Sequence, residues 1–306
     1  MRARVLEEQV RVEARRFYDG GALPDGDSPE VPPAPGHAPR IVLERHAEQE
    51  IEVFSMERRL AYLDRHLGEL LVPAARGFRT DLTSVPALFT WLVPKTGAHL
   101  PAALLHDGLV GGEDGASYVS TEGHRLSRVE ADRVFRDAMA DTGTGVVRRW
   151  IVWSAVTLAT IFVGSGTART AWGRWALRAG VGATLLLIVH LGYSATADLF
   201  DRSWPLAWQV PWMGDRSWWV EVAGGLAAAI VVPLVLCAAW GRFWPAGAIG
   251  GVMLAVLLHV TVGLAVITLG YQAVEWVARR APWAARLLLV GVVTVALATF
   301  AWLVGS

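Results

Sequence analysis

Three carboxylates and one imidazole form the polar set in this sequence that could support chemistry: Asp81, His106, Asp107 and Asp132. His106 has leucines on both sides, so its helical turn is expected to be buried. A buried carboxylate or imidazole must be paired or hydrogen-bonded. Because convergence would satisfy all four groups at once, we expect these side chains to lie close together.

Convergence of these groups permits two interpretations, of which the first is functional. His106, Asp107 and Asp132 would bind a divalent metal, because imidazole and carboxylate groups are common metal ligands. The metal would lower the pKa of a bound water for hydrolysis, with Asp81 or Asp132 as the general base. All four residues would then be catalytic.

The structural interpretation explains the same residues without a reaction. Asp81 would cap a turn by accepting hydrogen bonds from the backbone N–H groups of Thr83 and Ser84. His106 and Asp107 would be satisfied by backbone groups or by arginines. The sequence leaves both interpretations open, so it does not decide whether the protein is an enzyme.

Short apolar runs before Asp81 predict the strands that would position it. These runs are residues 41–43, 51–54 and 70–72, and each stands near charged residues. A short helix over Ser55–Leu67 is an alternative for part of this region.

Three helices are predicted to follow the strands. The first is short and covers Pro86–Trp91, because proline is favoured in the first turn of a helix. The second contains residues 102–107. Ser127 and Glu130 have the spacing of a capping box, which predicts a third helix over about residues 128–143.

Three motifs occur in order along this region. They are GFRTDLTSVP at Gly77–Pro86, AALLHD at Ala102–Asp107, and ADRVF at Ala131–Phe135 followed by Met139. Together they resemble the bacterial and phage family called domain of unknown function 1353. The resemblance covers about residues 41–164, and it implies no particular activity because none is established for the family.

The sequence departs from the family pattern in three ways. Thr83 replaces the usual alanine, which is a conservative change. Gly108 and Leu109 follow the His-Asp pair where the family often has an aromatic residue, so this motif is expected to pack differently. A membrane region follows the domain, and most phage members lack one, so a role in phage assembly is not carried over.

Charge divides the chain into two halves. Residues 1–150 carry 19 Lys+Arg and 23 Asp+Glu, whereas residues 151–306 carry 9 Arg and 5 Asp+Glu. Because a soluble domain averages about 25% charged residues, the second half is not one. The mildly acidic first half excludes a nucleic-acid binder that relies on a basic surface. The one cysteine, Cys237, excludes an internal disulfide framework and a cysteine-cluster zinc site.

Four apolar stretches are long enough to span a bilayer, which takes roughly 20 residues. They are residues 178–199, 219–240, 246–270 and 284–303. The shorter stretch 151–165 is predicted to be a buried or interfacial helix, or else a short fifth span. The expected fold class is therefore a small α+β domain followed by an all-α transmembrane bundle of four or five helices.

Three parts of the chain are expected. Residues 1–40 form an N-terminal segment and tether, residues 41–164 form the domain, and residues 165–306 form the transmembrane region. Six prolines lie between Gly20 and Pro39, and they predict that this tether is flexible.

Arginine placement indicates the orientation in the membrane. With four spans and a cytoplasmic domain, the inside has Arg148, Arg149, Arg169, Arg174, Arg178 and Arg242, and the outside has Arg202, Arg216, Arg279, Arg280 and Arg286. The positive-inside rule favours this arrangement by six arginines to five. Five tryptophans between residues 200 and 219 predict a loop that lies along a membrane surface. The protein is thus predicted to be integral to a bacterial inner or plasma membrane.

Three functions are compatible with this organisation. The first is a membrane-anchored cytoplasmic binding or scaffold domain, and the second is a metal-assisted hydrolase with a divalent metal as cofactor. The third is a small channel or transporter, for which His190 and His259 inside the spans are the supporting residues. The lipid bilayer is an expected partner, and the glycine-rich spans near residues 224–225 and 247–251 would permit a homo-oligomer.

Overall fold

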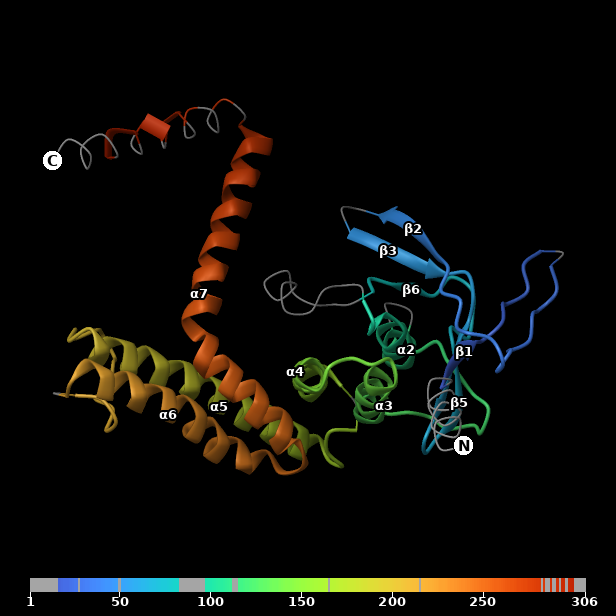
Figure 1. Ribbon diagram of the computed structural model, residues 1–306, viewed down its shortest axis with the longest axis horizontal. Coiled ribbons are helices and arrows are strands. Elements are labelled where there is room, and N and C mark those ends of the chain that lie inside the picture. The colour runs from blue at the N-terminus through green and yellow to red at the C-terminus, as the bar shows by residue number, and fades with distance from the viewer. Residues whose placement is uncertain are drawn as a thin grey trace, which may run out of the picture. The chain divides into compact units, whose positions relative to one another are not determined.

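The computed structural model describes residues 16–26, 28–48, 51–82, 97–111, 115–164, 166–214 and 216–281, with further isolated residues between 283 and 299. The chain forms two compact units, Met1–Val256 and Leu257–Ser306. In the first unit, strands and the helices α2, α3 and α4 gather together, and long apolar helices follow them (Figure 1). The predicted mixture of α and β structure is confirmed.

One antiparallel sheet lies at the centre of the domain. Its strands are β1 (Phe17–Asp19), β4 (Leu60–Asp64), β5 (Gly68–Val72) and β7 (Val119–Ser120), in the order β1-β4-β5-β7. Leu60 pairs with Val72 and Tyr62 pairs with Leu70, so all four of these buried side chains lie on one face. This face packs against the helices.

A second antiparallel sheet has the order β2-β3-β6 and consists of β2 (Leu43–Glu48), β3 (Ile51–Met56) and β6 (Arg79–Thr80). The strands predicted at 51–54 and 70–72 are confirmed, whereas only Leu43 of the predicted strand at 41–43 lies in β2. The helix considered over Ser55–Leu67 is wrong. Leu60 and Tyr62 point inward while Leu63 is 47% exposed, and this period of two is that of a strand.

The proline-rich segment differs from the predicted flexible tether. The strand β1 pairs with β4, and Ala22 forms a bridge with Val31. Asp19 also forms an ion pair of 2.6 Å with Arg58 in the turn before β4. The described residues between 17 and 37 are therefore attached to the domain. The composition of the segment did not predict this, because it carries no information about pairing with distant strands.

Two helices cover the inner face of the central sheet: α2 (Leu100–Val110) and α3 (Arg128–Asp141). Their positions match the predicted second and third helices. Ser127 and Glu130 make both hydrogen bonds of the predicted capping box. The predicted helix at Pro86–Trp91 lies outside the described residues.

The core of the domain lies between this sheet and the two helices. Its fully buried side chains come from both layers, and the largest of them are Tyr62, Leu60, Leu70, Leu104, Leu105 and Met139. Two polar contacts also tie α3 to β4. Tyr62 donates a hydrogen bond of 2.8 Å to Asp141, and Arg133 forms an ion pair of 3.0 Å with Asp64.

The next helix, α4 (Val146–Val163), runs antiparallel to α3 along its length. Near the start of α4, Trp150 and Trp153 lie under the guanidinium group of Arg136 at 5.2 and 5.6 Å. Near its end, Ile161 lies in a cluster with Val129 from the first turn of α3. The two helices thus form one hairpin.

Three helical stretches are long and apolar enough to cross a membrane: Val146–Val163, Ala171–Leu199 and Trp218–Val260. The second is α5 (Ala171–Leu199), and the third contains α6 (Trp218–Cys237), the 3-10 helix η2 (Ala238–Phe243) and the start of α7 (Trp244–Arg280). Gly241 has φ 58° and ψ −128°, which interrupts the helix between α6 and α7. Most of the predicted span 284–303 lies outside the described residues.

Gly108 allows α2 to approach β5 closely. A Cβ atom at this position would lie 2.1 Å from Cγ1 of Val72, which is fully buried. This contact explains why the position after the His-Asp pair accommodates no side chain.

We therefore expect Gly108→Ala to destabilise the protein, although alanine normally favours a helix by about 1 kcal/mol over glycine. Overpacking a core costs about 1–3 kcal/mol, so the clash with Val72 should exceed this gain. The measurement is the thermal unfolding midpoint of the full chain in detergent. The double variant Gly108→Ala/Val72→Ala should lose less than the sum of the single variants, and a stabilised Gly108→Ala protein would contradict the close packing.

Candidate functional site

A hydrogen bond joins two of the four predicted site residues across the helices. Nε2 of His106 on α2 lies 2.9 Å from Oδ1 of Asp132 on α3. The His106 ring also stacks on Phe135 of α3, with 4.6 Å between the ring centroids. Asp132 is only 2% exposed, and its Oδ2 atom is buried without a hydrogen-bond partner among the described residues. Sequence position placed Asp132 beside the apolar arc of α3, and the structure confirms that it faces the domain.

A second hydrogen bond joins α2 to the end of β6. The hydroxyl group of Thr80 donates to Oδ2 of Asp107 at 2.5 Å and accepts from the backbone N–H of Leu82 at 2.9 Å. Leu82 has φ 69°, a left-handed conformation that is uncommon for a leucine. Thr80 therefore holds the turn at residues 80–82 against α2.

Burial raises the pKa of Asp107 to about 6, because the charged form loses its hydration. The hydrogen bond from Thr80 and the charge of His106 oppose this shift, whereas the negative charge of Asp81 adds to it. A carboxyl group with a pKa near neutrality is able to exchange protons under physiological conditions. Asp107 is thus the predicted site residue with the most unusual electrostatics.

The metal-ligand set predicted from the sequence is divided between two pairs. His106 is bonded to Asp132, whereas Asp107 is bonded to Thr80. Within the described ranges, no three His, Cys, Asp or Glu side chains form a group that could hold a metal ion. The two hydrogen bonds connect the turn after β6 to α2 and α2 to α3. Catalysis by these residues stays a prediction.

Asp81 lies close enough to Asp107 to raise the pKa of its carboxyl group by charge repulsion. Its own side chain is partly buried and has a partner. The cap that Asp81 was predicted to make with Thr83 and Ser84 lies outside the described residues.

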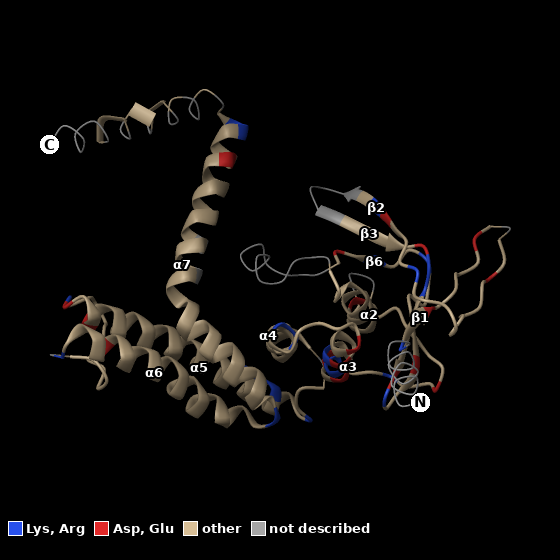
Figure 2. Cartoon of the chain, in the orientation of Figure 1, with Lys and Arg blue, Asp and Glu red and all other residues tan. Residues whose placement is uncertain are grey.

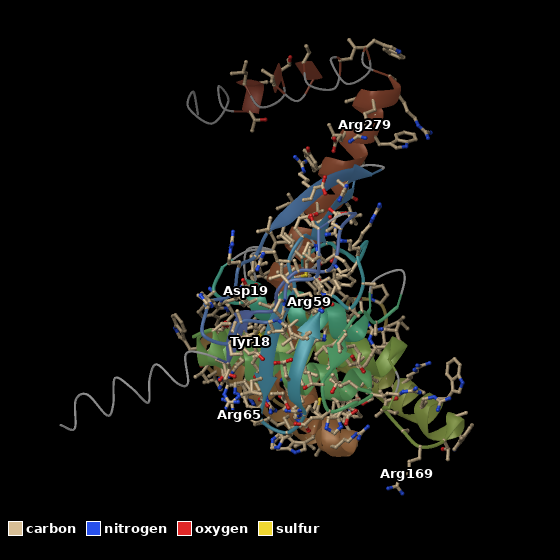
Figure 3. The ribbon with its side chains drawn as sticks, turned by 90° about the vertical axis from the view of Figure 1, so that its right-hand side faces the viewer. Tyr18, Asp19, Arg59, Arg65, Arg169 and Arg279 are labelled. Atoms are coloured by element: carbon tan, nitrogen blue, oxygen red, sulfur yellow. The ribbon has the colours of Figure 1, made fainter. Side chains whose placement is uncertain are left out.

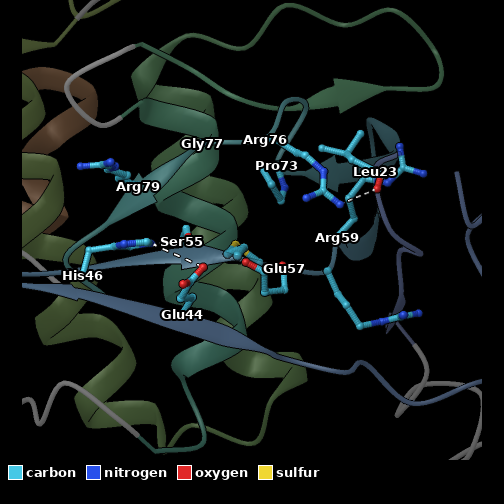
Figure 4. Close-up of a pocket in the computed structure, with 12 residues that line it drawn as sticks. Leu23, Glu44, His46, Ser55, Glu57, Arg59, Pro73, Arg76, Gly77 and Arg79 are labelled. Carbon is cyan, nitrogen blue, oxygen red and sulfur yellow. Dashed lines mark hydrogen bonds and ion pairs between the residues drawn. The ribbon is translucent and has the colours of Figure 1, made fainter. Parts of the chain in front are cut away.

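A pocket of about 220 Å³ opens between the two sheets, and its lining includes none of the four predicted site residues. Its lining comes from several separate segments (Figure 4), and includes Leu23, Glu44, His46, Ser55, Met56, Glu57, Arg58, Arg59, Pro73, Arg76, Gly77 and Arg79. Nε2 of His46 lies 2.9 Å from the hydroxyl oxygen of Ser55 and 3.9 Å from a carboxylate oxygen of Glu44. These polar groups could orient a small polar ligand.

Arginines at the edge of this pocket attach the N-terminal segment to the domain. Arg58 pairs with Asp19, and Figure 3 shows Asp19 and Arg59 on neighbouring parts of the domain. Arg59 forms an ion pair of 2.7 Å with Glu30 and also donates to the carbonyl of Gly20 at 3.0 Å. These arginines are consequently committed to protein partners.

Sequence patterns did not identify this pocket. His46 and Ser55 lie nine residues apart on β2 and β3, and neither stands in a recognisable motif. They meet because β2 pairs antiparallel with β3, with Glu44 opposite Ser55. The register in which the two strands pair would have shown that His46 and Ser55 meet. The short apolar runs in the sequence do not predict this register.

Comparison with protein families identifies one region of the chain, and it contains the four predicted site residues. Residues 54–156 match the family described as Protein of unknown function (DUF1353). The predicted resemblance is confirmed over this segment. It runs from β3 into α4, and it includes Asp81, His106, Asp107 and Asp132. No curated protein and no solved structure matches the chain.

The raised pKa of Asp107 predicts how stability depends on pH. The folded protein binds the proton with a pKa of about 6, whereas the ordinary value is 3.8, so the wild-type domain loses stability as the pH rises through this interval. Asp107→Asn keeps an oxygen that accepts from Thr80 but removes the charge. We expect it to stabilise the full chain by about 2–3 kcal/mol at pH 7.5 and to have little effect near pH 4.

Unfolding of wild type and variant in detergent across this pH range provides the measurement. A difference that is the same at both ends of the range would show that burial of the Asp107 charge has no energetic cost. Thr80→Val serves as the comparison, since it removes the hydroxyl group that favours the charged form and should destabilise most at high pH.

Proposed function

We propose that this protein is a membrane-anchored binding module whose DUF1353 domain is held at a bilayer surface by α5, α6 and α7. Three helical stretches have the length and composition to cross a membrane. Only two of them, α5 and the stretch from α6 into α7, would do so in this proposal. The helix α4 instead lies in the plane of the membrane surface.

The packing of α4 against α3 carries this proposal. α3 has seven charged residues in fourteen, namely Arg128, Glu130, Asp132, Arg133, Arg136, Asp137 and Asp141. If α4 crossed the bilayer, α3 would have to enter the hydrocarbon with it, and burying its charged groups there would be costly. Since α3 accompanies α4 over its length, α4 belongs to the domain rather than to the spanning helices.

The two faces of α4 support a surface position. Its buried face includes three hydroxyl residues, Ser154, Thr157 and Thr160, each at most 3% exposed. Apart from Arg148 in its first turn, its exposed residues are apolar, and Val147 and Val163 are 74% and 68% exposed. An isolated soluble domain would leave this apolar face in water, whereas a bilayer surface would cover it.

The direction of α4 is also that of an in-plane helix. In Figure 1, α3 and α4 are seen end-on, while α5 and α6 run across the view. The last turn of α4 meets the bundle in an apolar cluster of Ile161 with Val181, Trp240 and Phe243. This cluster connects the end of α4 to α5 and η2 by packing.

Charge supports a cytoplasmic domain. The loop between α4 and α5 lies beside η2, because Arg242 donates a hydrogen bond of 3.0 Å to the carbonyl of Thr167. Both segments carry arginines, and Figure 2 shows positive residues at this end of α5, α6 and α7. The same loop meets the start of α3, where a Cβ atom on Gly166 would lie 2.8 Å from Cβ of Ser127. The positive-inside rule therefore favours a cytoplasmic domain.

The opposite end of α5 has the tryptophan-rich loop. Trp208 and Trp219 are 56% and 73% exposed, as expected for indoles at a membrane interface. The loop folds back on α5, since Ser194 accepts a hydrogen bond of 3.0 Å from the backbone of Trp208. The ring of His190 packs on Trp208 with 4.3 Å between the centroids, so this histidine lies next to the loop.

The polar pairs of the domain favour a binding module over the hydrolase. His106 and Asp107 each have a protein partner that joins secondary-structure elements. The pocket beside His46 and Ser55, in contrast, has polar groups and an open volume of about 220 Å³. We therefore assign ligand binding to this pocket and structural support to the His106–Asp132 pair.

Sidedness of single cysteines tests the anchoring. Cys237 is fully buried, so the parent chain should not react with a membrane-impermeant maleimide. Arg125→Cys reports on the domain and Ala171→Cys on the start of α5, whereas Leu206→Cys reports on the distal loop, where Leu206 is 86% exposed. With α4 in the membrane plane, residues 125 and 171 react only after the membrane is permeabilised, and residue 206 reacts in intact cells.

Labelling of Ala171→Cys in intact cells, with Arg125→Cys protected, would show that α4 crosses the bilayer. Extraction of the full chain by alkaline carbonate without detergent would overturn the anchoring itself. The Cys237→Ala background removes residual labelling of the parent chain in every variant.

A further inference from the structure

Four arginines gather where α4 meets the bundle. We call this set the arginine rim, and it consists of Arg169, Arg174, Arg178 and Arg242. The first three lie in the α4–α5 connection and the first two turns of α5, and the fourth lies in η2. Arg169 is exposed, and Figure 3 shows it at the periphery of the molecule.

Two of these arginines are fixed by backbone carbonyl groups. Arg242 donates to the carbonyls of Gly166 and Thr167, and Arg178 donates from Nε to the carbonyl of Ile161 at 3.0 Å. A guanidinium group has five N–H donors, so these bonds leave most of its donors for a ligand. The rim is thus partly preorganised.

The segments that carry the rim contain no counter-charges of their own. The sequences of residues 164–178 and 237–247 contain no aspartate or glutamate. The ion pairs formed by the described part of the chain lie elsewhere, in the domain and at Arg279. The opposite end of α5 and α6 differs, because residues 198–221 contain four carboxylates and two arginines. Of the two ends of the α5–α6 pair, the domain end is therefore the one with an excess of positive charge.

Exposed indole rings accompany the arginines. Trp172, Trp175 and Trp244 are 81%, 66% and 53% exposed, and the guanidinium group of Arg178 lies 5.7 Å from the centroid of Trp175. Indoles prefer the headgroup level of a bilayer, where an arginine can reach lipid phosphates. A soluble phosphate would make no use of three exposed indoles, which favours a lipid as the ligand.

We propose that the arginine rim binds the phosphate of anionic phospholipids on the domain side of the membrane. This inference rests on the proposed membrane anchoring and adds a lipid class to it. Arg169 and Arg174 contact the headgroup, Arg178 and Arg242 are held in place by their carbonyl partners, and the indoles lie beside the first acyl carbons. The domain is thereby drawn onto an acidic membrane surface.

Lipid selection by the full chain tests the proposal. The purified protein is placed in mixed micelles of phosphatidylcholine and phosphatidylglycerol, and native mass spectrometry measures the ratio of the two bound lipids. Wild type should prefer phosphatidylglycerol. Arg169→Gln/Arg174→Gln should reduce this preference by about fivefold per arginine, since each arginine near an anionic surface contributes an effect of that order.

Two matched variants complete the experiment. Arg169→Lys/Arg174→Lys keeps the charge and should keep the preference, which excludes a folding defect as the cause. Arg202→Gln/Arg216→Gln removes the same charge from the opposite end and should leave the ratio unchanged. Equal losses at the two ends, or no preference in wild type, would overturn the proposal.

Competition with inorganic phosphate tests whether the rim binds free phosphate rather than a lipid. Added phosphate at millimolar concentration should not displace the bound phosphatidylglycerol, and complete displacement would show that the rim takes free phosphate instead. Incorporation into bilayer nanodiscs separates the proposed membrane anchoring from the proposed lipid binding by the arginine rim. A chain that enters no bilayer contradicts the anchoring and the rim together, whereas a chain that enters bilayers of either lipid without selection contradicts the rim alone.

Discussion

The pairing of a charged helix with an apolar one constrains the rest of this structure. α3 and α4 are joined by a connection of four residues and stay in contact from Arg136 and Trp150 at one end to Val129 and Ile161 at the other. Because α3 cannot enter hydrocarbon without a high cost, we propose that α4 stays at the membrane surface. The proposed orientation of the bundle follows from this restriction.

Hydrogen bonds extend the same rigidity into the domain. The His106–Asp132 pair joins α2 to α3, and the Thr80–Asp107 pair joins the turn after β6 to α2. The close approach of Gly108 to Val72 then places α2 on the central sheet. The motif residues within the segment that matches the DUF1353 family therefore connect successive layers, and the buried charge of Asp107 is the destabilising element among them.

Local sequence patterns predicted the parts of this fold that depend on neighbouring residues. The capping box at Ser127 and the apolar arc beside Asp132 are such cases, and both are confirmed. Contacts between distant segments were not predictable, as the attachment of Asp19 to Arg58 and the pocket at His46 show. Hydropathy could not assign α4 either, because its eighteen residues are long and apolar enough for a span and only its partner α3 argues against one.

Depth measurements on α4 test the central claim most directly. Spin labels at Val147 and Val163, which are both exposed, lie sixteen residues apart on one helix, or about 24 Å. In the full chain reconstituted in bilayers, the relative accessibility of each label to oxygen and to a polar relaxation agent reports its depth. The account predicts similar depths, close to the headgroups of one leaflet. A label at Val147 in one headgroup region and a label at Val163 in the other would contradict it.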